Sequence, residues 1–156
     1  MSSPVPQESQ TFGYLLRTTY EMLQQRIYAS LHEEGFPDVR AAHSSVLRHL
    51  PPAGARMTDL AKDAGISKQS IAYLVDDLCR LGYVEMHEHP TDGRARQVRF
   101  TERGRVLVAL LAQQSSKAEK DCAGIIGERS MALVREALTA LISRKRLGSE
   151  DERESR

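Results

Sequence analysis

The sequence predicts a mainly α-helical protein that carries one small β wing. Apolar residues recur at gaps of three and four over most of the chain, which is the spacing of one helix face. Two short stretches, Tyr83–His89 and Arg96–Phe100, instead alternate apolar and polar residues as paired strands do. The 156 residues include no Trp, three Phe and five Tyr, so we expect a core of Leu, Val, Ile and Ala packed between helices.

Two helices are expected in the first third of the chain. The apolar spacing predicts a helix over Thr11–Glu34, and Gly35-Phe36-Pro37 ends it. A second helix is expected over Val39–Leu50, before the break at residues 51–54. The side chains expected to point inward from it are Ala42, Val46, Leu47 and Leu50.

The next segment has the pattern of a helix-turn-helix. Thr58 is expected to cap a short helix over Asp59–Ala64, and Gly65-Ile66 makes the turn. Ser67 is expected to cap the following helix, which runs to Leu81. Its inner face is formed by Ile71, Leu74, Val75 and Leu78, and its outer face by Gln69, Tyr73, Asp76 and Arg80.

The two alternating stretches predict a hairpin directly after this helix. An antiparallel register with Met86 opposite Val98 places Val84 opposite Phe100. The same register places Glu85 opposite Arg99 and Glu88 opposite Arg96, so that apolar residues face each other and acids face bases. A hairpin in this place is the wing of a winged helix-turn-helix.

Long helices with apolar stripes are expected at the C-terminal end as well. Thr101 caps one that runs to about Cys122, Gly124 and Gly127 interrupt, and the last helix covers Glu128–Lys145. These stripes need a surface to cover them, and a two-fold symmetric partner supplies one, so we expect a homodimer. The expected parts are a disordered lead-in (1–10), an N-terminal dimerisation helix (11–37), a winged helix-turn-helix DNA-binding domain (38–101), C-terminal dimerisation helices (102–147) and a disordered tail (148–156).

Nucleic-acid binding is indicated by where the charge lies. The first turn of the outer helix, Ser67, Lys68, Gln69 and Ser70, offers side chains and free N–H groups suited to base edges and phosphates. Asp76 and Asp77 would repel a duplex, so we expect the C-terminal half of this helix to lean away. Residues 94–105 hold five arginines and a single acid, whereas the whole chain has a net charge of +1. Arginine suits a narrow minor groove.

The run from Leu60 to Gly104 resembles the MarR family of bacterial winged helix-turn-helix transcriptional regulators. The matching elements are the helix-turn-helix, LGYVE before the hairpin, Asp92-Gly93-Arg94 in it, and FTERG after it. The resemblance implies homodimers, with Arg94 in the minor groove, Asp92 as its positioning partner, and Ser67–Ser70 with Tyr73 facing the major groove. It also implies that a small phenolic or anionic compound relieves DNA binding, or that a cysteine senses oxidants.

Several residues retain alternative interpretations. The hairpin arginines have the alternative interpretation of a solvated surface that binds nothing. This alternative is strongest for Arg96 and Arg99, because Glu88 and Glu85 lie opposite them and can pair with them. Gly93 suits a positive φ at the hairpin tip. His87 and His89 share a strand face but are too few for a zinc site. Cys79 is expected to be a small buried residue, while the exposure of Cys122, and any effector role of His32 or His43, stay open.

The function expected from these observations is a DNA-binding transcriptional regulator, a repressor that binds a pseudo-palindromic site and is released by a small aromatic or anionic effector. The alternatives are a winged-helix module for protein interaction and a cysteine-based redox-sensing regulator. No nucleophile–base pair, phosphate loop or metal-ligand cluster indicates an enzyme, a metal or another cofactor. Two cysteines without metal spacing, no secretion signal and no apolar run of membrane length predict a cytoplasmic protein.

Overall fold

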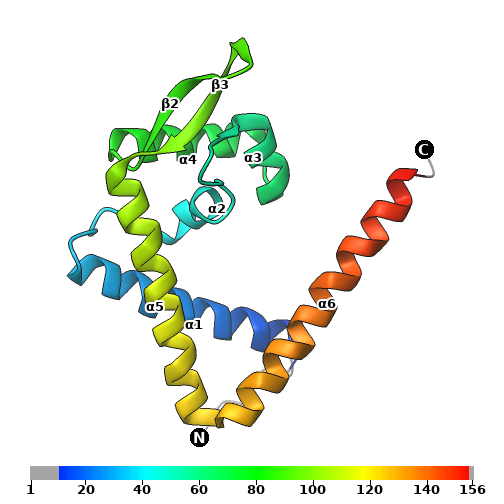
Figure 1. The fold of residues 1–156 in the computed structure, drawn as a ribbon. Helices are drawn as coiled ribbons and strands as arrows, with labels where there is room; N and C mark the ends of the chain where they lie inside the picture. The colour runs from blue at the N-terminus through cyan, green and yellow to red at the C-terminus, as the bar shows by residue number, and fades with distance from the viewer. Residues whose placement is uncertain (1–10, 155–156) are drawn as a thin grey trace, which may run out of the picture. The chain divides into compact units, whose positions relative to one another are not determined.

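A computed structural model describes the backbone of residues 11–154 and the side chains of residues 11–88, 90–91 and 96–144. The expected lead-in, residues 1–10, lies outside the described residues. The chain divides into two compact units, of which the first runs to Ser115 and the second begins at Ser116. The predicted class, mainly helical with a small antiparallel sheet, is confirmed (Figure 1).

The helices and strands follow the expected order along the chain. They are α1 (Phe12–Glu33), η2 (Ala41–His43, a 3-10 turn), α2 (Ser44–Leu47), β1 (Ala55–Arg56), α3 (Met57–Ala64), α4 (Lys68–Arg80), β2 (Val84–His89), β3 (Asp92–Phe100), α5 (Glu102–Ile126) and α6 (Glu128–Glu154). Three hydroxyls cap helices: Thr11 Oγ1 accepts from Tyr14 N (3.2 Å), Ser67 Oγ from Ser70 N (3.0 Å) and Thr101 Oγ1 from Gly104 N (3.0 Å). Each satisfies an N–H group that has no partner within the helix.

The helix expected over Val39–Leu50 is much shorter in the structure. Arg40 is extended (φ −115°, ψ 155°), and only η2 and α2 follow it. A 3-10 turn has three residues per turn rather than 3.6, so its inward face is displaced relative to an α-helix. As a result Ala42 is exposed, and His43 takes the inward position beside Val46.

Two other expected helix boundaries are wrong. Thr58 does not cap α3, because Ala55–Arg56 pairs as a strand and the chain enters the helix directly from it, with Arg56 at the cap position. The tail expected to be disordered from residue 148 continues α6 as far as Glu154. Glu and Arg there are good helix formers, which tolerate the single Gly148.

The predicted hairpin register is confirmed at all four pairs. Val84 lies opposite Phe100, Glu85 opposite Arg99, Met86 opposite Val98 and Glu88 opposite Arg96, with an irregularity between Glu88 and His89. The sheet has a third strand that the sequence did not predict, since β1 pairs with β3 and gives the order β1-β3-β2. A strand of two residues is too short to show alternation.

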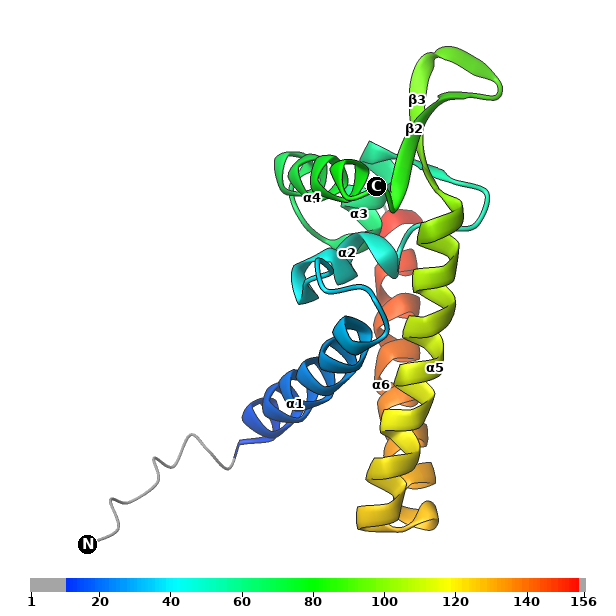
Figure 2. The ribbon, with the colours of Figure 1, turned by 90° about the vertical axis from the view of Figure 1, so that its left-hand side faces the viewer.

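The apolar core of the first unit joins the helix-turn-helix to the hairpin and to the start of α5. Its fully buried side chains come from α1, α2, α3, α4, both long strands and α5; they include Leu31, Val46, Leu60, Ile71, Val75, Leu78, Tyr83, Val98 and Leu107. Figure 1 shows α2, α3 and α4 gathered beside the base of the hairpin, and Figure 2 shows the hairpin projecting beyond them. The core therefore holds α4 and the hairpin as one body.

Candidate nucleic-acid interface

The helix α4 buries one face and exposes the other, as its sequence predicts. Ile71, Val75 and Leu78 are completely buried, and Leu74 packs partly against them. The outer residues Ser67–Ser70 are all exposed, and Tyr73 is 66% exposed. The first turn thus presents hydroxyl, amide and ammonium groups to solvent beside the N–H end of a helix, where the helix dipole favours an anion.

Asp77 does not carry the free negative charge that the sequence suggests. It is 6% exposed and accepts from three donors, namely Arg40, His43 and Arg80. Hydrogen bonding from His43, supported by Arg80 and Arg40, lowers the pKa of Asp77 to about 2. The carboxylate is therefore charged near neutral pH but paired with its neighbours, so Asp77 is not the free negative charge on which the expected repulsion of a duplex depends.

His43 belongs to this network and has a defined hydrogen-bonding role. Its ring is fully buried, its Nδ1 accepts from the backbone N–H of Arg40 (3.1 Å), and its Nε2 lies 2.9 Å from Asp77 Oδ2. Because Nδ1 is an acceptor, the proton of the neutral ring belongs on Nε2, which donates to the carboxylate. Of the two roles left open for His43, the surface position is therefore excluded.

The arginines of β3 and of the start of α5 divide into two groups. Arg96 is exposed, and Arg99 is half-buried and donates from Nε and Nη2 to the Gln97 side-chain oxygen when that amide faces it (2.7 and 2.8 Å). Arg103 and Arg105 bond the protein itself: Arg103 Nη1 donates to Leu81 O (3.2 Å), and Arg105 Nη1 to Phe100 O (3.1 Å). The positive charge counted over residues 94–105 thus overstates the charge that the hairpin offers to a ligand.

Arg103 sits in a cluster that joins the start of α5 to the loop after α1. Its guanidinium lies 4.6 Å from the centre of the Tyr83 ring and 3.5 Å from Asp38. The Tyr83 hydroxyl donates to Asp38, and burial together with that carboxylate raises the pKa of Tyr83 to about 12. This cluster stabilises the base of the hairpin and offers no free cation.

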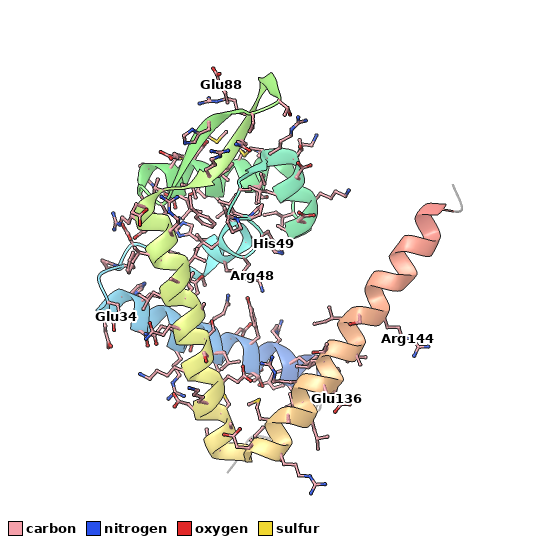
Figure 3. The ribbon with its side chains drawn as sticks, in the orientation of Figure 1. Glu34, Arg48, His49, Glu88, Glu136 and Arg144 are labelled. Atoms are coloured by element: carbon pink, nitrogen blue, oxygen red, sulfur yellow. The ribbon has the colours of Figure 1, made fainter. Side chains whose placement is uncertain are left out.

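The tip of the hairpin holds the residues that the resemblance assigns to the minor groove. Asp92, Gly93 and Arg94 lie at the start of β3, and their side chains are outside the described residues. Figure 3 labels Glu88, which lies towards this end of the hairpin. The roles of Asp92, Gly93 and Arg94 therefore stay predictions.

The remaining candidate residues have ordinary partners. His32 Nε2 lies 2.9 Å from Val39 O, and His87 Nε2 lies 2.8 Å from Glu85 Oε1. Cys79 and Cys122 are both half-buried free thiols. Burial, followed by the charge of Asp76, raises the pKa of Cys79, which reduces its reactive thiolate form near neutral pH.

Neither a metal cluster nor a membrane-spanning helix occurs among the described residues. No group of three or more His, Cys, Asp or Glu in that part of the chain is placed to hold a metal ion. Nor does any helix in that part combine the length and apolar character that crossing a membrane requires.

Sequence reasoning missed Arg40, His43 and Asp77 as one group. Asp77 and Arg40 are 37 positions apart in the chain, and Asp77 and His43 are 34 apart. A group of this kind leaves no periodic signal, because its members meet only when the segment before α2 packs against α4.

Comparison with known proteins finds a family match for part of the chain. Residues 38–95 match the model of the MarR family. No curated protein matches the sequence. The matched segment contains η2, α2, α3, α4 and the hairpin up to the first residues of β3.

Solved structures share the fold over most of the chain. The repressor CouR bound to a 23-mer DNA duplex is 21% identical, with 92% of this chain and 98% of that chain covered and a TM-score of 0.68. CouR from Rhodococcus jostii RHA1 bound to p-coumaroyl-CoA is 24% identical (88% and 95% covered, TM-score 0.67). Wild-type apo MarR from E. coli is 18% identical (84% and 96% covered, TM-score 0.68). With a family match over residues 38–95 and this fold around it, the chain contains a MarR-family segment within a winged helix-turn-helix fold.

Proposed function

We propose that this protein is a DNA-binding transcriptional regulator that acts as a homodimer on a pseudo-palindromic site. The observation that carries the proposal is the exposed first turn of α4, held by a buried face beside a projecting hairpin. A helix presented in this way enters the major groove with its N-terminal residues, and the hairpin reaches the neighbouring groove. Ser67, Lys68, Gln69, Ser70 and Tyr73 are the proposed major-groove residues.

The hairpin supplies the second part of the proposed interface. Arg94 is proposed to enter the minor groove, with Asp92 directing its guanidinium and Gly93 allowing the tight tip, and Arg96 is proposed to contact the backbone. Arg96 is exposed on β3, opposite Glu88. An arginine at position 94 is favoured in the minor groove because a narrow minor groove has the most negative potential of the duplex.

The direction of regulation is proposed from the relatives. CouR is a repressor seen on DNA and, in another structure, with p-coumaroyl-CoA. A repressor released by a small aromatic or anionic compound is the corresponding proposal for this chain. No residues are assigned to the binding of such an effector. A cytoplasmic location is proposed because a transcriptional regulator acts on DNA.

Dimerisation is proposed from the apolar side chains that the helices leave exposed within each unit. In α1 these are Phe12, Tyr14, Leu15, Leu16, Tyr20 and Met22, and in α6 they are Leu133, Val134, Leu141 and Ile142. Exposed apolar surface on this scale marks an interaction site. We expect sedimentation equilibrium at micromolar concentration to give the mass of two chains, and a single-chain mass across that range would contradict the dimer.

Replacement of the hairpin arginine tests the DNA interface. Arg94→Ala is expected to weaken binding to the chain's own promoter region by about 1–3 kcal/mol, with unchanged thermal unfolding, because a groove contact is lost without a core residue. The measurement is fluorescence anisotropy over a salt series, in which wild-type affinity should fall steeply as salt rises. Wild-type protein with no preference for the promoter over random DNA would favour a protein-interaction module instead.

A further inference from the structure

Arg40 lies at the start of η2, ahead of α2 and the helix-turn-helix, and reaches across to α4. Its backbone is extended at the start of η2, and its side chain is 55% exposed. The guanidinium contacts Asp77 of α4. An arginine from outside the recognition helix therefore lies against the flank of that helix.

The row of α4 residues that Arg40 approaches includes two of the proposed base-reading residues, Ser70 and Tyr73. Ser70, Tyr73 and Asp77 are spaced by three and four, so they lie one above the other on the helix. Asp77, and to a lesser degree a hydrogen bond with Tyr73, raise the pKa of Arg40. Since Tyr73 is 66% exposed on the outer face, the Arg40 guanidinium lies at the edge of the surface proposed to meet DNA.

The direction of the Arg40 side chain is constrained at both of its ends. His43 Nδ1 accepts from the Arg40 backbone N–H (3.1 Å), while the Asp77 carboxylate that binds His43 Nε2 (2.9 Å) also binds the guanidinium. His43 and Asp77 are almost completely buried, so this support is rigid. A guanidinium has five N–H donors, and the pairing with Asp77 leaves others directed to solvent.

Charge at this flank favours an anion. Asp77 is shared by two cations, Arg40 and Arg80, of which Arg80 is 77% exposed. One carboxylate between two guanidinium groups leaves an excess of one positive charge in this group of three, while the exposed Asp76 of the same helix lies outside it. The flanks of a helix lying in the major groove face the phosphates of the groove walls, which are the anions nearest to such a position.

We propose that Arg40 is a DNA-phosphate contact of this protein and that Asp77 is the residue that positions it. This assignment rests on the proposed DNA-binding function. It predicts that Arg40 contributes to affinity without reading sequence, because a phosphate is the same at every base pair. It also predicts that the contribution depends on Asp77 even though Asp77 is an acid.

The first experiment compares Arg40→Ala with wild type on two duplexes of equal length, one from the promoter region and one of random sequence. We expect affinity to fall on the order of tenfold on both, as for loss of a hydrogen bond to a charged group. The slope of log affinity against log salt should decrease by about 1. Alanine keeps the backbone N–H that His43 accepts, and thermal unfolding checks that the variant is folded.

Arg48→Ala is the matched control because it removes an arginine from the same domain. Arg48 is exposed directly after the end of α2, and its charge acts on Tyr28 of α1 (Figure 3). We expect its affinity and salt slope to equal those of wild type. Should Arg40→Ala fail to fold, Arg40→Lys keeps the charge: the salt slope should then persist while affinity falls, since a single ammonium cannot serve Asp77 and a phosphate as a guanidinium does.

A double-mutant cycle with Asp77→Asn tests the positioning role. Asparagine retains an oxygen that accepts from His43 Nε2 but removes the charge that holds Arg40. If net charge alone governed binding, Asp77→Asn would bind DNA more tightly; we expect it to bind several-fold more weakly. In that background, Arg40→Ala should cause little further loss.

The outcomes separate this assignment from the function on which it rests. Wild-type protein without salt-sensitive DNA binding would remove the proposed function itself. Wild-type binding that Arg40→Ala leaves unchanged would overturn the role of Arg40. If Arg40→Ala causes a loss of equal size in the wild-type and the Asp77→Asn backgrounds, the positioning role of Asp77 is overturned. The results that overturn the role of Arg40 or of Asp77 would each leave DNA binding by the wild-type protein in place.

Discussion

Gly104→Ala is expected to lower the free energy of unfolding by about 3 kcal/mol or more, the upper end of what overpacking a core costs. A Cβ at this position would lie 1.9 Å from the Tyr83 carbonyl oxygen and 3.2 Å from Phe100 Cδ1. The first of these atoms is backbone, so it has no side-chain rotation by which to move away. Either α5 shifts away from the hairpin or the hairpin base opens.

The close approach at Gly104 is part of a hydrogen-bonded joint between α5 and the hairpin. Thr101 N donates to Tyr83 O (3.1 Å), Thr101 Oγ1 donates to Gly82 O (2.6 Å), and Gly104 N donates to Thr101 Oγ1 (3.0 Å). The Thr-x-x-Gly spacing in FTERG therefore has a physical cause. The Thr101 hydroxyl caps α5 and also bonds the carbonyl of Gly82 at the turn before β2, and only Gly at position 104 allows α5 to lie this close to Tyr83.

Gly124→Ala in the same helix is the matched control for this prediction. Gly124 has no atom within 4 Å of an added Cβ, and Ala is the better helix former. We expect Gly124→Ala to leave stability unchanged or raise it by up to about 1 kcal/mol. Chemical denaturation followed by circular dichroism measures both variants, and a Gly104→Ala midpoint equal to that of wild type would show that the approach is not close.

Leu78→Ala is expected to cost about 2–5 kcal/mol of stability, because a completely buried Leu is replaced by a cavity. Leu78 lies on the inner face of α4 with Ile71 and Val75, so the loss falls on the packing that orients this helix. We expect weaker DNA binding as a consequence of the lower folded population, and this loss should shrink when the temperature is lowered towards that of maximum stability.

Tyr73→Ala separates packing from recognition on the same helix. Tyr73 is 66% exposed on the outer face, so its removal should change stability by less than about 0.5 kcal/mol. Its loss should nevertheless weaken DNA binding at every temperature. Denaturation and DNA titration of the two variants give opposite patterns if α4 has one packed and one reading face, and similar patterns would contradict that division.

Local patterns along the chain were sufficient for much of this fold. The hairpin register followed from alternation over Tyr83–His89 and Arg96–Phe100, because a shift of one residue would turn every apolar side chain to the other face. The Ser67 cap and the inner face of α4 followed from spacing alone. The family resemblance rested on the same short segments, and the family match covers most of them.

Other features depend on residues that meet only in the folded chain. The short strand β1, the 3-10 turn at η2 and the burial of His43 are decided by partners in β3 and α4. The same holds for Arg103, which the sequence counts as charge for DNA and the structure places against Asp38 and Tyr83.

The sequence by itself determined the helical class, the paired strands and the residues that α4 turns outward. Each of these depends on apolar residues that recur at intervals of two to four positions, which can be read along the chain. Only the tertiary structure decided which charges are free. Asp77 is paired with Arg40, which lies 37 positions earlier in the chain, and accepts a hydrogen bond from His43, which lies 34 positions earlier. Electrostatic partners are selected by proximity in space, and proximity between distant segments exists only after the core has assembled.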